Sequence, residues 1–128
     1  MALYKLIRNS TGVRRTSDGA CIPECSGNTD WISYTEWLAV PNTPDPAETL
    51  GEAQNRKKNE LRSDAMSDVT ASGYAYYRQF NINELQGFTQ EDKDSMWVAI
   101  NYIRAKCNTL ESGVDVCSGV AEVDAISW

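Results

Sequence analysis

A short aromatic segment that ends at a proline constrains the fold of this chain more than any other feature. Asp30 is a favourable N-cap, and the residues after it tolerate a helix. Pro41 lacks an amide hydrogen and disfavours helical geometry at Val40, so we predict a helix of about two turns. Because an isolated helix this short is marginal in water, its apolar face must be buried against something else.

The apolar face of this predicted helix is largely aromatic. On a helical wheel Ser33 and Glu36 point away from one stripe, which consists of Trp31, Tyr34, Trp37 and Leu38. We expect a local core, in which the aromatic side chains form a buried hinge between a small sheet and the helix. The alternative is a surface presented to a partner protein, because Trp and Tyr dominate the hot spots of protein interfaces.

The residues around this helix resemble a module found in small proteins of tailed bacteriophages that are associated with tail fibres, baseplates and fibre assembly. The pattern of the module is V-x-R-x-x-D-G-x-x-I-P, a short spacer, D-W-x-x-Y-x-x-W-L-A, and then N-T-P-x-P. It covers about a quarter of this chain, which departs from it at Pro41, where related sequences usually have glycine. The residues that fit the pattern are Arg15, Asp18, Gly19, Ile22, Pro23, Asp30, Trp31, Tyr34, Trp37, Leu38, Ala39, Asn42, Thr43, Pro44 and Pro46.

The resemblance implies a role in the virion and no particular chemistry. It implies a structural component of the phage tail, made in the host cytoplasm, that contacts other phage tail or fibre proteins. A tail-fibre assembly chaperone that is absent from the mature virion is one alternative. A receptor- or glycan-binding module is another, because Tyr74, Tyr76, Tyr77 and Phe80 form an aromatic run. Hydrophobic packing is the simpler interpretation of that run.

The length and the net charge of the chain limit the number of domains and the kinds of partner that it can have. With 128 residues it is one domain, or one small domain with an appendage, and an apolar fraction of 41% argues against disorder. A net charge of −6 disfavours nucleic acid and anionic membranes as partners, since both select basic surfaces. Solvated surface charge accounts for the basic runs Arg14–Arg15 and Arg56–Lys58. The sequence has no apolar run long enough to span a bilayer, so we predict no membrane partner.

The residue types do not match the common catalytic or metal-binding patterns. The chain has no histidine, which excludes Ser-His-Asp and Cys-His systems, and it has no glycine-rich phosphate loop, HExxH or EF-hand motif. Its four cysteines have CxxxC and Cx9C spacing, unlike the paired spacing of zinc ribbons. We predict no enzyme, no cofactor and no metal, with the cysteines as packed thiols and a disulfide or zinc site as less favoured alternatives. A two-carboxylate glycosidase is the main enzyme class left open.

The hydrophobic pattern predicts an α+β fold that begins with a small antiparallel meander. Alternating residues predict three strands, Leu3–Arg8, Val13–Thr16 and Ala20–Ile22. Asp18–Gly19 predicts a tight turn between the second strand and the third. The meander is too small to be stable alone, so we group it with the aromatic helix as a docking module over residues 1–44.

The region 45–128 is predicted to be mainly helical. One helix is expected over Pro46–Thr70, where Pro46 suits the first helical position but the apolar seam is thin. An extended aromatic segment is expected near 73–82. The second long helix is expected over Gln90–Leu110, and the tail Val114–Trp128 is expected to pack back or to pass to a neighbouring chain.

The apolar stripe of the helix expected over Gln90–Leu110 leads to a prediction of oligomers. Thr89 and Asp92 form a capping-box signal at its start. The stripe recurs at four-three-four-three spacing and consists of Met96, Ile100, Ile103, Cys107 and Leu110. It needs a partner helix that the thin seam of the other long helix cannot fully supply, so we predict a homo-oligomer. The resemblance to fibre proteins favours a trimer.

Overall fold

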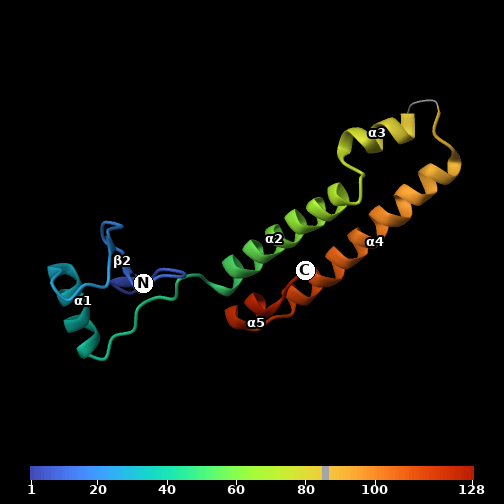
Figure 1. Ribbon diagram of the computed structural model, residues 1–128. Helices are drawn as coiled ribbons and strands as arrows, with labels where there is room; N and C mark the ends of the chain where they lie inside the picture. Colours follow the sequence, from blue (N-terminus) through green and yellow to red (C-terminus); the bar gives the residue numbers. More distant parts are fainter. Residues whose placement is uncertain (85–86) are drawn as a thin grey trace. The chain divides into compact units, whose positions relative to one another are not determined.

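The structure is a computed structural model that describes residues 1–84 and 87–128. The chain forms two compact units, Met1–Thr49 and Leu50–Trp128. The first unit holds a three-stranded antiparallel sheet and one helix, and the described part of the second unit is built of helices (Figure 1). The predicted α+β class, with its N-terminal meander and helical C-terminal region, is confirmed.

The sheet of the first unit is a meander whose strands follow one another in chain order. The strands are β1 (Tyr4–Leu6), β2 (Val13–Arg15) and β3 (Cys21–Ile22). Both pairs are antiparallel, and Val13 lies opposite Leu6 on one side and Ile22 on the other. Because β2 is the central strand, its buried Val13 anchors the sheet to the core beneath it.

Tight turns make the strands shorter than predicted. The Ser10 amide donates to the Ile7 carbonyl at 3.3 Å and Asn9 has a φ of 56°, so the chain turns before the predicted end of the first strand. The predicted turn between β2 and β3 is present. Gly19 has a φ of 75° there, which a residue without a Cβ adopts freely, and its amide donates to the Arg15 carbonyl at 2.9 Å.

The aromatic helix of the first unit is α1, which covers Thr29–Ala39. Its N-cap is Asn28, whose side-chain oxygen accepts from the amides of Asp30 at 2.9 Å and Trp31 at 3.2 Å. The prediction that Asp30 caps the helix is therefore wrong, and the helix is longer than predicted because it begins earlier. Asp30 lies in the first turn, where the helix dipole favours a carboxylate. Val40 is extended, so the helix ends just before the proline as predicted.

The core of the first unit lies between the sheet and α1. Its buried residues are Tyr4, Val13, Ile22 and Tyr34. Trp31 and Trp37 are half-buried and pack against this cluster. The loop after α1 returns to β1, where the Asp45 amide donates to the Tyr4 carbonyl and the Leu6 amide donates to the Asp45 carbonyl, both at 2.9 Å. These bonds make the proline-rich loop part of the first unit.

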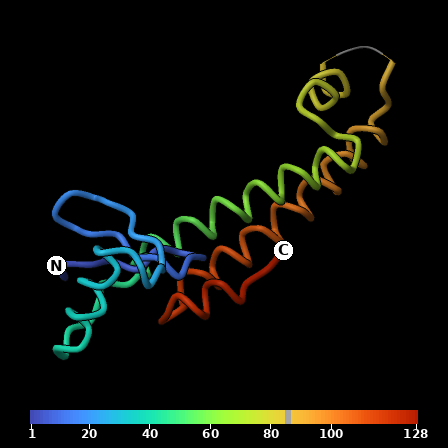
Figure 2. The backbone as a smooth tube through the Cα atoms, turned by 60° about the vertical axis from the view of Figure 1, so that its left-hand side comes forward, coloured from blue at the N-terminus to red at the C-terminus, as the bar shows by residue number. Residues whose placement is uncertain are grey.

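Two long helices, α2 (Leu50–Ala71) and α4 (Gln90–Asp115), form an antiparallel hairpin in the second unit. Figures 1 and 2 show them side by side along most of their length. The short helix α3 (Tyr76–Glu84) lies at the end where the chain passes from α2 toward α4. The other short helix, α5 (Val120–Ala125), lies at the opposite end of the hairpin and packs against α2.

The prediction of an extended aromatic segment near 73–82 is wrong, because most of that segment is α3. Gly73, with a φ of 88°, turns the chain after α2. The Ala75 carbonyl then accepts from the amides of Arg78 and Gln79 at 2.8 and 3.0 Å, which starts a new helix. Tyr76 and Phe80 are four residues apart on this helix, so they lie on one face, and both are exposed. Tyr74 precedes the helix and packs against the buried side chains beneath it.

The ends of the long helices also differ from the prediction. The first begins at Leu50 rather than at Pro46, because the bonds of the preceding loop to β1 hold that segment in another conformation. The second continues through Gly113 to Asp115. Val114 is fully buried, and that burial outweighs the cost of about 1 kcal/mol of one glycine in a helix.

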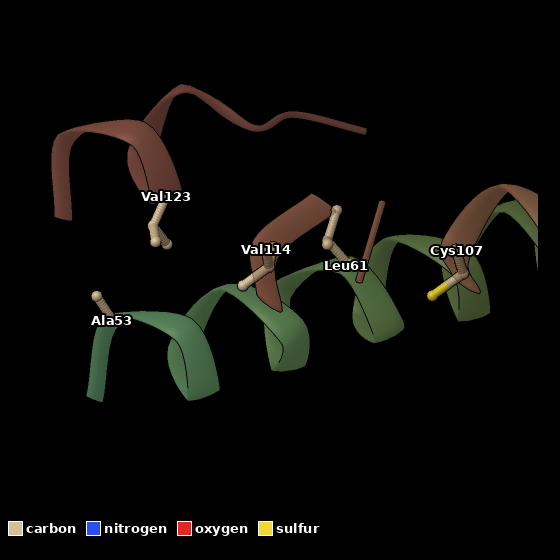
Figure 3. Close-up of a cluster of buried hydrophobic side chains, with 5 residues drawn as sticks. All are labelled: Ala53, Leu61, Cys107, Val114 and Val123. Atoms are coloured by element: carbon tan, nitrogen blue, oxygen red, sulfur yellow. The ribbon is translucent and has the colours of Figure 1, made fainter. Parts of the chain in front are cut away.

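Two clusters of buried side chains hold the second unit together. The α5 core consists of Ala53, Leu61, Cys107, Val114 and Val123 (Figure 3). The α3 core consists of Ile82, Met96 and Ile100. The apolar stripe of α4 is thus covered by α2, α3 and α5 of the same chain. The burial of this stripe within the chain gives no support to a homo-oligomer formed through it, so the homo-oligomer stays a prediction and would have to use other surfaces.

We predict that Leu61→Ala strongly destabilises the second unit. Leu61 is 1% exposed in the α5 core, and truncation removes buried methyl groups and leaves a cavity. We expect the free energy of unfolding to fall by about 2–5 kcal/mol. The control is Val98→Ala on α4, where the side chain is 72% exposed, and we expect a change below about 0.5 kcal/mol. Chemical denaturation followed by circular dichroism measures both, and equal effects would contradict the burial of Leu61.

Candidate functional site

Two carboxylates meet one guanidinium group in the first unit. Arg15 donates to both carboxylate oxygens of Asp18, from Nε to Oδ1 at 3.0 Å and from Nη2 to Oδ2 at 2.7 Å. Its Nη1 donates to Oδ1 of Asp30 at 2.8 Å. We call these three residues the Arg15 clamp. It links the turn after β2 to the first turn of α1.

The Arg15 clamp shifts the pKa of Asp18 and that of Arg15. Hydrogen bonds from the Arg15 guanidinium and from the Ala20 amide lower the pKa of Asp18 to about 2. The carboxylates of Asp18 and Asp30 in turn raise the pKa of Arg15. Because both carboxylates are open to water, solvent screens these pairs, and we assign them an orienting role rather than a large share of the stability.

Four aromatic rings fill the space between β1 and α1, and we call them the aromatic cluster. The Tyr4 centroid lies 5.0 Å from that of Tyr34 and 5.1 Å from that of Trp37, while Trp31 lies 5.0 Å from Tyr34. These spacings are typical of favourable aromatic pairs. Burial raises the pKa of Tyr34. Leu38, although predicted in the same stripe, is 37% exposed and lies outside the cluster.

The structure divides the candidate residues of α4 between its two cores. Met96 and Ile100 are buried in the α3 core. Ile103 is also buried, and Leu110 is half-buried against the α5 core. These side chains hold the hairpin together, so their surfaces are occupied within the chain.

One side of the hairpin carries a groove of about 800 Å³ that the sequence analysis missed. We call it the open groove. Its apolar lining includes Ala65 and Val69 from α2 and Ile100 from α4. Met66 and Trp97 also line it, and their side chains are 69% and 39% exposed. The open groove is therefore an accessible surface with apolar groups both inside it and along its edge.

The charged residues of the open groove are Arg62, Arg104 and Glu111. Arg62 Nε and Glu111 Oε1 lie 2.5 Å apart. A sequence signal for this surface exists beside the buried stripe of α4, in residues spaced four, three, four and three apart, namely Trp97, Asn101, Arg104, Asn108 and Glu111. Most of these side chains are polar, so the pattern is that of a solvent-facing helix surface.

We predict that the Arg15 clamp sets the titration of Asp18. The depressed pKa means that this carboxylate stabilises the folded state above its unfolded pKa of about 3.9, and that the contribution is lost as the pH falls toward about 2. Carboxyl NMR should therefore show Asp18 titrating near pH 2. In Arg15→Met the midpoint should rise toward about 3.9.

The control for this titration is Arg14→Met, which removes a neighbouring exposed guanidinium that contacts Cys21 Sγ rather than a carboxylate. It should leave the Asp18 midpoint close to that of the unsubstituted protein. An Asp18 that titrates at its ordinary value in the unsubstituted protein would contradict the clamp.

The remaining reactive groups of the described residues do not gather into a further site. Cys21 and Cys25 are exposed, whereas Cys107 is buried, which raises the pKa of its thiol. Within residues 1–84 and 87–128 no group of three or more His, Cys, Asp or Glu side chains is placed to hold a metal ion. Nor does this part of the chain contain a helix with the length and apolar character needed to cross a membrane. No protein-family model, curated protein or solved structure matches the chain.

Proposed function

We propose that this chain is a structural component of a bacteriophage tail, associated with the tail fibre or baseplate, that acts through protein–protein contacts. The observation that carries the proposal is the Arg15 clamp. Its members come from separate parts of the phage-module pattern, Arg15 and Asp18 from the first part and Asp30 from the second, and they bond to one another. If the residues matched the pattern only by chance, there would be no reason for them to bond to one another in the fold.

Other residues of the pattern also support the same small fold. The Asn42 side chain donates from Nδ2 to the Trp37 carbonyl at 2.8 Å and so satisfies an unpaired carbonyl at the end of α1. Ile22 of β3 is buried in the core of the first unit. The pattern therefore corresponds to one folded unit, which supports extending the phage role from the resemblance to this chain.

Leu38 is a residue of the pattern that the local fold does not bury. It lies at the C-terminal end of α1, and the exposed Val40 follows directly after the helix. Apolar side chains that remain in water on a small unit are suited to the core of an interface, where charged residues are depleted. We infer that this end of α1 contacts another tail or fibre protein.

The proposal assigns the chain to the virion tail after synthesis in the host cytoplasm. A trimer around a fibre axis remains part of it, but the contacts would have to come from exposed residues rather than from the α4 stripe. Tyr76, Tyr77 and Phe80 of α3 are exposed apolar candidates for such contacts. The same three rings favour the alternative of a glycan-binding module, because flat exposed aromatic faces can stack on sugars. A glycan array tests that alternative.

Mass spectrometry of purified phage particles tests the proposed function. A structural component should be present in washed particles at a fixed ratio to other tail proteins. An assembly chaperone should be detected in the infected-cell lysate and be missing from the particles, and that result would overturn the proposal.

We predict that Leu38→Asp prevents incorporation into particles while leaving the fold intact. A carboxylate at this exposed position would be desolvated in an interface without a partner, which is costly. Ser33→Asp adds the same charge at another exposed position of α1 and should be incorporated normally. Complementation with each variant, followed by quantification in particles and circular dichroism of the purified proteins, compares the two. Normal incorporation of Leu38→Asp would contradict a contact at this end of α1.

A further inference from the structure

The hairpin of α2 and α4 already binds one amphipathic segment, which is its own segment Val120–Trp128. Val123 is fully buried in the α5 core (Figure 3). Ile126 Cδ1 lies 3.8 Å from the position that a Cβ on Gly113 would occupy. The segment thus inserts apolar side chains against the hairpin over its whole length.

Polar contacts fix the same segment at the edges of the hairpin. Asp124 Oδ1 lies 2.6 Å from Arg56 Nη2 on α2. The Trp128 indole donates from Nε1 to Asp68 Oδ2 at 2.6 Å, and Lys106 Nζ lies 4.2 Å from the centre of the same ring. The hairpin therefore recognises a segment with apolar residues facing inward and a carboxylate that meets an arginine at the edge.

The open groove lies on the other side of the hairpin. At 100° per residue, Lys106 and Gly113, which face the Val120–Trp128 segment, fall on one side of the buried α4 stripe. Arg104 and Asn108, which line the open groove, fall on the other side. The lining residues come from α2, α3 and α4, so the chain's own segment does not line this groove.

The charge of the open groove is opposite to that of the chain. Arg62 and Arg104 against Glu111 give a local charge of +1, whereas the whole chain carries −6. Arg62 is paired with Glu111, and Arg104 has no ion pair with any residue of 1–84 or 87–128. An exposed arginine beside an apolar groove favours an acidic partner over a basic one.

We propose that the open groove binds an acidic amphipathic helical segment of a partner protein. Apolar side chains of the partner helix lie on the half-buried Ala65 and Val69, against the exposed Trp97 and Met66. A carboxylate of the partner pairs with Arg104, as Asp124 pairs with Arg56 on the filled side. The groove volume of about 800 Å³ suits a few side chains of such a helix. The proposal does not depend on a role in phage.

A labelled peptide with the sequence of residues 118–128 is the probe, because it has the chemistry that the hairpin already accepts. Fluorescence polarisation with the full chain measures its dissociation constant, and NMR of the labelled chain locates its site. We expect chemical-shift changes at Trp97 and Ile100 and a weaker affinity at higher salt, as for an interaction between opposite charges.

Arg104→Glu should weaken binding of the peptide by about tenfold or more. Lys93→Glu is the matched control, since it reverses a charge on the same helix outside the groove lining, and it should change the affinity by less than about twofold at 150 mM salt, where the Debye length is about 8 Å. Circular dichroism confirms that both variants are folded.

Three results would overturn the proposal. Equal affinities for Arg104→Glu and Lys93→Glu would remove the role of the arginine. Chemical-shift changes confined to Ala53 and Val123 would show that the peptide displaces the chain's own Val120–Trp128 segment instead. Light scattering could find that the unsubstituted chain is a dimer and that Arg104→Glu is a monomer. That result would assign the groove to a second copy of the chain.

Discussion

The apolar seam between α2 and α4 is the contact on which the second unit depends. The buried residues of α2 are Ala53 and Leu61, so this helix alone offers too narrow a surface to cover the stripe of α4. The short helices complete the coverage, because Ile82 of α3 packs on one end of the stripe and Val123 of α5 on the other. Burial of this seam, rather than helix propensity, holds the hairpin in its conformation.

The sequence predicts the parts of the fold that depend on local chemistry. The capping box at Thr89, the apolar stripe of α4 and the stop before Pro41 are all set by neighbouring residues. The side chains that cover the α4 stripe could not be predicted in this way. Ile82 and Val123 lie on short helices whose positions depend on tertiary contacts. The Arg15 clamp could be anticipated as a set of pattern residues but not as one site. The open groove escaped prediction because a groove belongs to two helices at once.

Charged side chains set the alignment of the hairpin more than its stability. Lys58 pairs with Asp115 and Arg62 pairs with Glu111, and both pairs join α2 to α4. The members of these pairs reach solvent, which screens their charges, so the pairs add little to the stability. The two pairs instead fix the register of α2 against α4, because a helix displaced by one turn would lose both of them. In a chain with a net charge of −6, Lys58 and Arg62 thus help to hold the two helices in register.

The α5 core has a consequence for the order in which this protein folds during synthesis. Ala53 meets Val123, so the core of the second unit cannot close until residue 123 has left the ribosome. The first unit closes its contacts within residues 1–49 and can fold much earlier. Until then the end of α2 that carries Ala53 lacks the side chain of Val123 that packs against it. The many charged residues of α2 keep this nascent helix in solution until Val123 has been synthesised.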